Sequence, residues 1–476
     1  MTELEVPDEQ KKQEEHGPEI VLLFLFICLL IGCACRFVLE LIHRKLKIRV
    51  PYSVVLLVLG GSWGALAWKN LQDNDGETKE LATISLTLWA NIDPHLILFV
   101  FLPALIYECA MGTNFYVFTN HFGSAIILAG PGMLVQTFLI AVVGRYMLPY
   151  EWGWAESMLF GGILSATDPV AVIALLKELG VLPDLRVLIE AESLLNDGTA
   201  IVVYELCLMI LIEPSTLANY VGTGFQLVLG APALGLAMFL GSVFWLNNTK
   251  DPIQDTIVTV CTAYLGFYVA ESGAGVSGVL TVVTIGILMA GYGNTSINTE
   301  EASHMLHAVW SIVVFCADTT IFVLAGAIII ERGFIAREDA FAGSDWGYLI
   351  ALYLCLLVIR AFMVVICAPY FRSYGYGLQS RTCSWEKFLK NMFIVTWGGL
   401  RGAVGLVLAL AVSVNLELQH AVKDERYGDR VLLHVAGIVV LTTLVNAALM
   451  EKIIKMLGMS EVSHAEQQLY EGALNF

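Results

Sequence analysis

The sequence predicts an all-α protein that crosses a membrane about thirteen times, in two inverted repeats of six helices whose broken helices cross. The first observation is composition: 57% of the 476 residues are hydrophobic and only 14% are charged, whereas a soluble domain carries about 25% charged residues. The second is a series of apolar runs of the length that spans a bilayer as a helix. The third is that one run in each half is interrupted near its centre by Gly or Pro.

The apolar runs divide into two sets of six around one further run. The first set lies at residues 19–43, 51–69, 92–111, 121–146, 154–178 and 185–213. The second set lies at residues 255–271, 275–291, 303–331, 346–372, 390–412 and 430–457. Only three residues separate 255–271 from 275–291, so these two runs fit either one long broken span or two helices in a tight hairpin.

This arrangement predicts the domain organisation. We expect a first inverted repeat over 19–213 and a second over 255–457, joined by a Gly-rich linker helix over 220–246. Segments 1–18 and 458–476 flank them. The first run follows an acidic segment rather than the short basic region of a secretory signal, so we interpret it as a retained membrane helix.

The charge and the cysteines exclude several classes of protein. A net charge of −17 argues against a nucleic-acid partner and leaves membrane lipids as the expected surroundings. The ten cysteines follow neither a disulfide framework nor a zinc-ligand spacing. We expect no cofactor.

The loops predict the orientation. Cytoplasmic loops carry an excess of Lys and Arg, and the most basic connections are residues 43–49 and 372–390. The N-terminal segment and the loop 73–80 are acidic. We therefore expect a multi-pass protein with its N-terminus outside and its C-terminus in the cytoplasm.

The run Leu188–Leu206 is apolar but carries polar groups that a bilayer disfavours: Glu190, Glu192, Asn196, Asp197 and Glu205. A charge at mid-membrane depth costs at least about 2.5–3.5 kcal/mol, so an intramembrane carboxylate indicates a functional role. Ser193 and Asp197 are four residues apart and share one helix face. Because burial disfavours the charged form of an acid, a proton and a cation would compete for Asp197.

The run 154–178 contains Thr167-Asp168-Pro169 at its centre. Pro169 lacks a backbone donor and clashes with the preceding turn, so we expect the helix to break beside Asp168. In the second half, the run 390–412 contains Gly398-Gly399-Leu400-Arg401-Gly402. Interrupted helices at matching positions of two halves indicate a binding site near the middle of the membrane.

Together these groups form a candidate cation site. Thr167, Asp168 and Ser193 offer oxygens that suit a hard monovalent cation. Asn196 supplies a neutral oxygen beside Asp197, which leaves Asp197 as the one group that exchanges a proton for a cation. One cation would then replace one proton, and no net charge would move.

Three further intramembrane charges need partners. An arginine side chain is not neutralised by losing its proton, so Arg360 and Arg401 should each be paired. We expect the ion pairs Asp318–Arg360 and Glu192–Arg401 to support the site rather than to contact the ion.

Several motifs resemble one family along nearly the whole chain. They are Phe101-Leu102-Pro103, the segment 165–170, Glu192-Ser193-Leu194-Leu195-Asn196-Asp197 and Gly399-Leu400-Arg401-Gly402. Together they resemble the sodium/proton exchangers of the cation/proton antiporter superfamily. Two departures are Ala104, where many animal exchangers have a second proline, and Asp318, where they have Glu.

The resemblance implies roles for particular residues. Asp197 would carry both the proton and Na⁺, Asp168 would lie where two unwound helices cross, and Asp318 and Arg360 would form a salt bridge near Arg401. The Na⁺ ligands would be Asp197, Asp168 and Ser193. The fold would be the antiporter fold, working by alternating access in a homodimer.

The resemblance also bears on location and regulation. It implies a plasma-membrane protein that exchanges Na⁺ for H⁺. The sequences of these motifs are closest to those of the plant salt-tolerance and sperm-specific branches. Members of those branches carry long cytoplasmic regulatory regions. This chain ends at Phe476 without one, so it is either a transport module alone or part of a longer protein.

Other functions leave specific signatures. A K⁺- or Li⁺-selective antiporter on the same scaffold remains open, because nothing in the sequence determines the cation. An intramembrane aspartyl protease could use Asp168 and Asp197, but its Gly-x-Gly-Asp pattern is absent. A membrane scaffold without transport would have no use for carboxylates on broken helices.

Overall fold

The computed structural model describes most of the chain, and every element in the described part is a helix. The described residues are 19–46, 51–73, 81–90, 94–168, 172–173, 175–176, 183–212, 214–249, 251–293, 300–330, 343–375, 378 and 383–459. The predictions for residues 1–18, for Pro169 and for residues 460–476 lie outside this set.

Most of the apolar runs form helices of membrane-spanning length. Among the described residues, nine helices are long and apolar enough to cross a bilayer, and four shorter ones are also apolar. The predicted all-α class is therefore confirmed.

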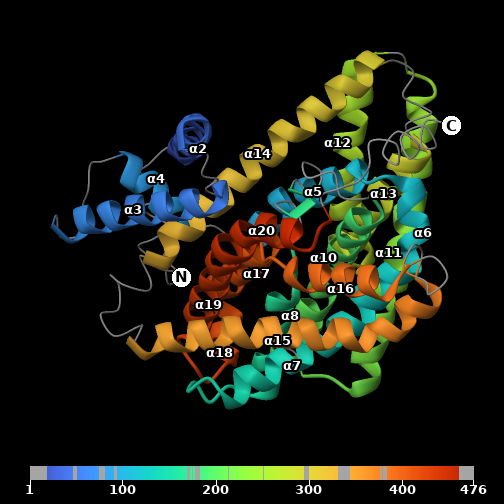
Figure 1. Ribbon diagram of the computed structural model, residues 1–476. Coiled ribbons are helices and arrows are strands. Elements are labelled where there is room, and N and C mark those ends of the chain that lie inside the picture. The colour runs from blue at the N-terminus through green and yellow to red at the C-terminus, as the bar shows by residue number, and fades with distance from the viewer. Residues whose placement is uncertain are drawn as a thin grey trace. The chain divides into compact units, whose positions relative to one another are not determined.

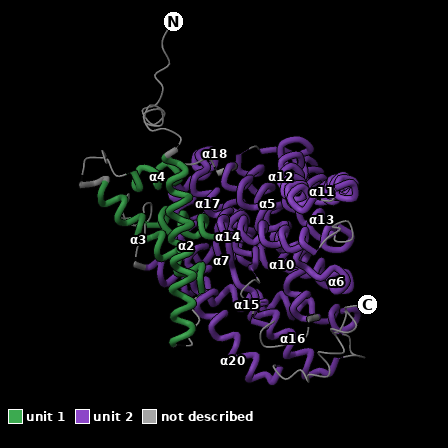
Figure 2. Tube along the Cα trace, turned by 90° about the horizontal axis from the view of Figure 1, so that it is seen from above, with its two compact units in different colours: residues 1–93, 318–341 green, residues 94–317, 342–476 purple. Residues whose placement is uncertain are grey.

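The chain divides into two compact units, coloured separately in Figure 2. Unit 1 comprises residues 1–93 and 318–341, and unit 2 comprises residues 94–317 and 342–476. These units differ from the two halves expected from the sequence, and the inverted repeat stays a prediction.

Unit 1 consists of α2 (Glu19–Leu46), α3 (Tyr52–Asp73), α4 (Leu81–Ala90) and the C-terminal part of α14 (Glu300–Ile330). Backbones of α3 and α14 touch, because a Cβ added at Gly60 would collide with the carbonyl of Val323. One added at Gly326 would collide with the carbonyl of Leu57. Small residues allow this close approach between membrane helices.

Helix α4 was not among the predicted runs, because its ten residues are too few to cross a bilayer. Its Trp89 side chain donates from Nε1 to the carbonyl of Val21 on α2 at 2.7 Å, which holds α4 against α2.

Unit 2 contains the remaining helices, and its α-helices are labelled in Figure 1. In chain order they are α5 (Pro94–Gly112), α6 (Phe115–Ile127), η1 (Leu128–Gly132), α7 (Met133–Tyr146), α8 (Trp154–Ser165), α10 (Pro183–Ile212), α11 (Leu217–Leu246), α12 (Pro252–Tyr268), η2 (Val269–Ala274), α13 (Gly278–Gly291), the N-terminal part of α14, α15 (Gly343–Tyr374), α16 (Trp385–Trp397), α17 (Ala403–Val414), α18 (Leu416–Ala421), α19 (Tyr427–Leu441), η5 (Thr442–Ala447) and α20 (Ala448–Met456).

Three π-helical turns, η1, η2 and η5, adjust the paths of long helices. In η1 the turn accommodates Pro131, so α6, η1 and α7 form one continuous span. In the pair 255–271 and 275–291 the chain reverses after η2 at Gly275, whose φ of 58° favours glycine. The two runs are therefore separate helices in a tight hairpin.

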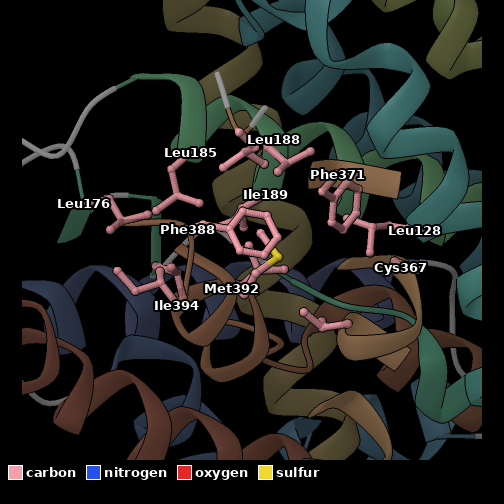
Figure 3. Packing of buried hydrophobic residues seen from close by; sticks show 14 of the residues in the cluster. Leu128, Leu176, Leu185, Leu188, Ile189, Cys367, Phe371, Phe388, Met392 and Ile394 are labelled. Atoms are coloured by element: carbon pink, nitrogen blue, oxygen red, sulfur yellow. The ribbon is translucent and has the colours of Figure 1, made fainter. Parts of the chain in front are cut away.

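A buried apolar cluster fixes α16 against its neighbours in unit 2. Figure 3 shows side chains of α16 meeting those of α10 and α15. The labelled members are Leu128, Leu176, Leu185, Leu188, Ile189, Cys367, Phe371, Phe388, Met392 and Ile394. Membrane helices associate through close packing of this kind. The cluster thereby places α10, which carries the predicted carboxylates, beside the half-helix that precedes Gly398.

Candidate cation site between two broken helices

Both predicted interruptions are real breaks in helices. Helix α8 ends at Ser165, and residues 166–168 are not helical. Ala166 has φ −55° and ψ 135°, which lies outside the helical region. In the second half α16 ends at Trp397 and α17 begins at Ala403. Neither the run 154–178 nor the run 390–412 is a continuous helix.

The two breaks cross each other. The backbone N–H of Asp168 donates to the carbonyl of Leu400 at 2.9 Å. A Cβ added at Gly402 would collide with the Asp168 carboxylate, so the two unwound segments pass in direct contact. The expected crossing of the broken helices is confirmed.

Arg401 occupies this crossing. Its Nη1 donates to the carbonyls of Ser165 and Ala166 at 3.3 and 3.2 Å. These are carbonyls that lose helical partners where α8 ends. Since a buried polar group in a membrane must be satisfied by protein, the guanidinium replaces the missing backbone donors.

The polar face of helix α10 lines one side of the site. Asn196 donates from Nδ2 to the carbonyl of Ser165 at 2.9 Å and to Oγ1 of Thr167 at 3.2 Å. The hydroxyl of Ser193 donates to the carbonyl of Thr167. Ser193, Asn196 and Thr167 are buried. The structure thus brings together the predicted residues of both segments.

Two oxygen atoms in this cluster stand out. Asp197 Oδ1 and Asn196 Oδ1 are buried, and neither has a hydrogen-bond partner in the described part of the chain. Leaving a buried acceptor unsatisfied costs about 1–3 kcal/mol. Asp168 and Arg401 lie close enough to Asp197 to act on it electrostatically. The arrangement offers a carboxylate oxygen and an amide oxygen to a proton or to a cation.

The supporting ion pair differs from the prediction. Arg360 on α15 binds Glu192 on α10 in a bidentate pair, with N–O distances of 2.5 and 2.7 Å. The two side chains are 5% and 2% exposed. The predicted pairs Asp318–Arg360 and Glu192–Arg401 are therefore wrong. The physical reason is that carbonyls of the broken α8 hold Arg401, which leaves Glu192 to Arg360.

Arg360 also donates from Nη2 to the carbonyl of Val395 in α16, at 3.3 Å. A Cβ at Gly399 would lie 3.0 Å from Arg360 Nε. One guanidinium therefore connects α15, α10 and α16 immediately before the second break.

Sequence reasoning missed several polar residues near the site. Thr113, at the end of α5, donates to Oε1 of Glu190 at 3.1 Å. Thr442 and Asn446 of η5 bond to the second break. A threonine or asparagine within an apolar run is the only signal in the sequence, and it does not indicate which helix it faces. Glu271 accepts from the backbone N–H of Gly278 at 2.7 Å and so satisfies a donor at the start of α13.

Comparison with known proteins decides the family. A family model described as "Sodium/hydrogen exchanger, transmembrane" matches residues 28–453. The chain belongs to the sodium/hydrogen exchanger family. It is thus a member of the cation/proton antiporter superfamily, whose proteins are transporters rather than enzymes. The alternative of an intramembrane protease is set aside.

Relatives of this family member include proteins from plants and bacteria. Over 461 residues it is 36% identical to sodium/hydrogen exchanger 7 and 35% identical to sodium/hydrogen exchanger 8 of Arabidopsis thaliana. Each match covers 96% of this chain, which spans 38% and 58% of those two proteins. It is 30% identical to the Na⁺/H⁺ antiporter ApNhaP of Aphanothece halophytica, covering 86% of this chain and 70% of that protein.

Solved structures show the same fold. The sodium proton antiporter MjNhaP1 of Methanocaldococcus jannaschii superposes with a TM-score of 0.69 at 18% identity. The match covers 92% of this chain and 99% of that one. The expected antiporter fold is confirmed.

Proposed function

We propose that this chain exchanges Na⁺ for H⁺ across a membrane, with Asp197 as the shared carrier. The observation that carries the proposal is the pair of buried, unpartnered oxygens, Asp197 Oδ1 and Asn196 Oδ1, beside the crossing of two broken helices. The family relatives named as sodium/hydrogen exchangers support the choice of ions.

In this mechanism the two ions compete for one carboxylate. When Asp197 is ionised, its oxygen, with Asp168 and the hydroxyl of Ser193, provides the hard oxygen ligands that Na⁺ prefers. When a proton arrives, the carboxyl becomes neutral and the cation leaves. Asn196 holds the unwound segment after α8 against α10, because its amide donates to the carbonyl of Ser165 and to the hydroxyl of Thr167.

The remaining features follow the same proposal. Alternating access would expose Asp197 to one side of the membrane at a time. We place the protein in the plasma membrane as a homodimer, with the N-terminus outside and the C-terminus in the cytoplasm. Residues 19–213 and 255–457 would be the two inverted repeats, and lipids would surround the outer helices. The greater length of the plant relatives leaves room for a regulatory region beyond this chain.

A flux assay tests the function. Purified protein in proteoliposomes should produce a Na⁺-dependent change of internal pH, and Asp197→Asn should abolish it while remaining folded. Asp251→Asn is the matched control, because Asp251 is an exposed helix cap and an amide still accepts there. Replacing Na⁺ with K⁺ or Li⁺ in the same vesicles identifies the cation. Cation-dependent proton flux through a well-folded Asp197→Asn protein would contradict the proposal.

A further inference from the structure

The break between α16 and α17 leaves several backbone groups without helical partners, two of them at Trp397 and Arg401. The carbonyl of Trp397 lies at the last residue of α16, and the N–H of Arg401 lies in the unwound segment. In the hydrocarbon core of a bilayer such groups must be hydrogen-bonded to other protein groups, since water and lipid tails offer them no partners there. Both groups bond to the same element, the π-helical turn η5 of the last membrane helix.

Asn446 is the hydrogen-bond partner of the Trp397 carbonyl. Its Nδ2 donates to the carbonyl of Trp397 at 3.3 Å, while the indole Nε1 of Trp397 donates to the carbonyl of Asn446 at 3.0 Å. Asn446 is 1% exposed. The hydroxyl of Tyr353 on α15 donates to Oδ1 of Asn446 at 2.6 Å, so the amide has its NH₂ group turned toward Trp397.

Thr442 is the hydrogen-bond partner of the Arg401 N–H. Its hydroxyl donates to the carbonyl of Ile438, at 2.8 Å, and accepts from the backbone N–H of Arg401, at 3.3 Å. A hydroxyl is the one small side-chain group that can do both. Thr442 and Asn446 are four residues apart and therefore share a helix face. π-helical turns within α-helices occur frequently at functional sites.

A continuous series of contacts leads from η5 to the candidate cation site. Thr442 fixes the backbone of Arg401, and the Arg401 side chain binds the carbonyl of Ser165. The same carbonyl accepts from Asn196, the neighbour of Asp197. A shift of the break would therefore move the groups that surround Asp197.

We propose that Thr442 and Asn446 are positioning residues for cation binding. They hold residues 398–402 so that Arg401 keeps the unwound part of α8 against α10. Neither side chain contacts the ion. The inference rests on the proposed function, because it assigns η5 a part in the same site.

Conservative substitutions of two neighbouring threonines test this inference. Thr442→Val removes the hydroxyl and leaves the Arg401 N–H unsatisfied, whereas Thr442→Ser keeps the hydroxyl. Thr443→Val is the matched control: Thr443 is buried in the same turn and donates to the carbonyl of Val439 at 2.6 Å. We expect Thr442→Val to raise the KM for Na⁺ by about tenfold. Thr442→Ser and Thr443→Val should stay within about twofold of the parent.

The assay compares initial rates of exchange per folded protein, with the heat of Na⁺ binding as a second readout. If Thr442→Val and Thr443→Val have the same KM, or if Thr442→Ser has the KM of Thr442→Val, the inference is wrong. Should Thr442→Val fail to fold, Tyr353→Phe replaces it, since this change frees the Asn446 amide. We expect a smaller rise in KM from Tyr353→Phe, and an unchanged KM would overturn the inference. A parent protein without exchange would instead contradict the proposed function.

Discussion

Arg360 and Glu192 form a buried ion pair whose value lies in arrangement more than in stability. Removing two charges from water costs several kcal/mol per ion, and their attraction offsets this cost only with good geometry. Here the geometry is bidentate, and a third bond reaches the carbonyl of Val395. The pair therefore fixes α15 and α16 relative to α10 beside the site.

Removing one member of this pair should destabilise the protein. Arg360→Ala leaves Glu192 buried and unpaired, which costs about 3–5 kcal/mol. Arg360→Met combined with Glu192→Gln removes both charges and should recover part of the loss. Folded yield and thermal unfolding in detergent measure the effect. A single Arg360→Ala variant as abundant and as thermostable as the parent would show that the pair is dispensable.

At this scale the sequence located the polar residues but not their partners. The sequence predicted Asp197, Asn196 and Ser193 as residues of the site. Polar side chains are rare in apolar runs, and those present indicate a functional role. The partner of Arg360 was not predictable, because any intramembrane acid satisfies the same charge. Only the packing of α15 against α16 and α10 selects Glu192.

At the scale of the element, Gly and Pro predicted the breaks. The segments around Asp168 and Gly399 interrupt their helices as expected. The π-helical turn η1 contains Gly130, Pro131 and Gly132 and yet continues its helix, so Gly and Pro alone do not distinguish a break from such a turn. The turn η5 and the short helices α4 and α18 contain neither residue, and the sequence gives no comparable signal for them.

Gly402 should be essential because the two breaks touch there. Gly402→Ala would place a methyl group into the Asp168 carboxylate and push the unwound segments apart. Misplacement by about 1 Å near a reacting site can cost a hundredfold in rate, so we expect a loss of that order in exchange rate per folded protein. Gly241→Ala is the control, since nothing lies within 4 Å of its added Cβ. An exchange rate within twofold of the parent would contradict the crossing geometry.

Within unit 1, Gly326 should matter for stability. Gly326→Ala would force the backbone of α14 away from the carbonyl of Leu57 on α3. Overpacking of this kind typically costs about 1–3 kcal/mol. Thermal unfolding in detergent should show a lower midpoint for Gly326→Ala than for Gly347→Ala, whose added Cβ meets nothing within 4 Å. Equal midpoints would mean that the two helices separate without cost.

At the scale of the whole molecule, hydropathy predicted the class, and the described residues contain nine helices long and apolar enough to cross a membrane. The two inverted repeats stay a prediction, and the compact units divide the chain at other positions. Apolar length alone identifies membrane helices, since a bilayer imposes it. The grouping depends on which faces pack, and α14 contributes to both units. A linear pattern contains no such information.

The last prediction concerns charge balance over a complete transport cycle, and it follows from the proposed carrier. The site crosses the membrane twice, once with Na⁺ and once with H⁺. If Asp197 alone exchanges the two, one negative charge is cancelled by one positive charge in each direction, and no net charge moves. Asp168 is the group that could alter this balance: its backbone N–H donates to the carbonyl of Leu400, and its carboxylate lies against Gly402. Exchange in vesicles at a set membrane potential should therefore reverse where the Na⁺ and H⁺ gradients balance, whatever the potential. A reversal point that moves with voltage would mean that a second carboxylate titrates, with Asp168 as the first residue to test by Asp168→Asn.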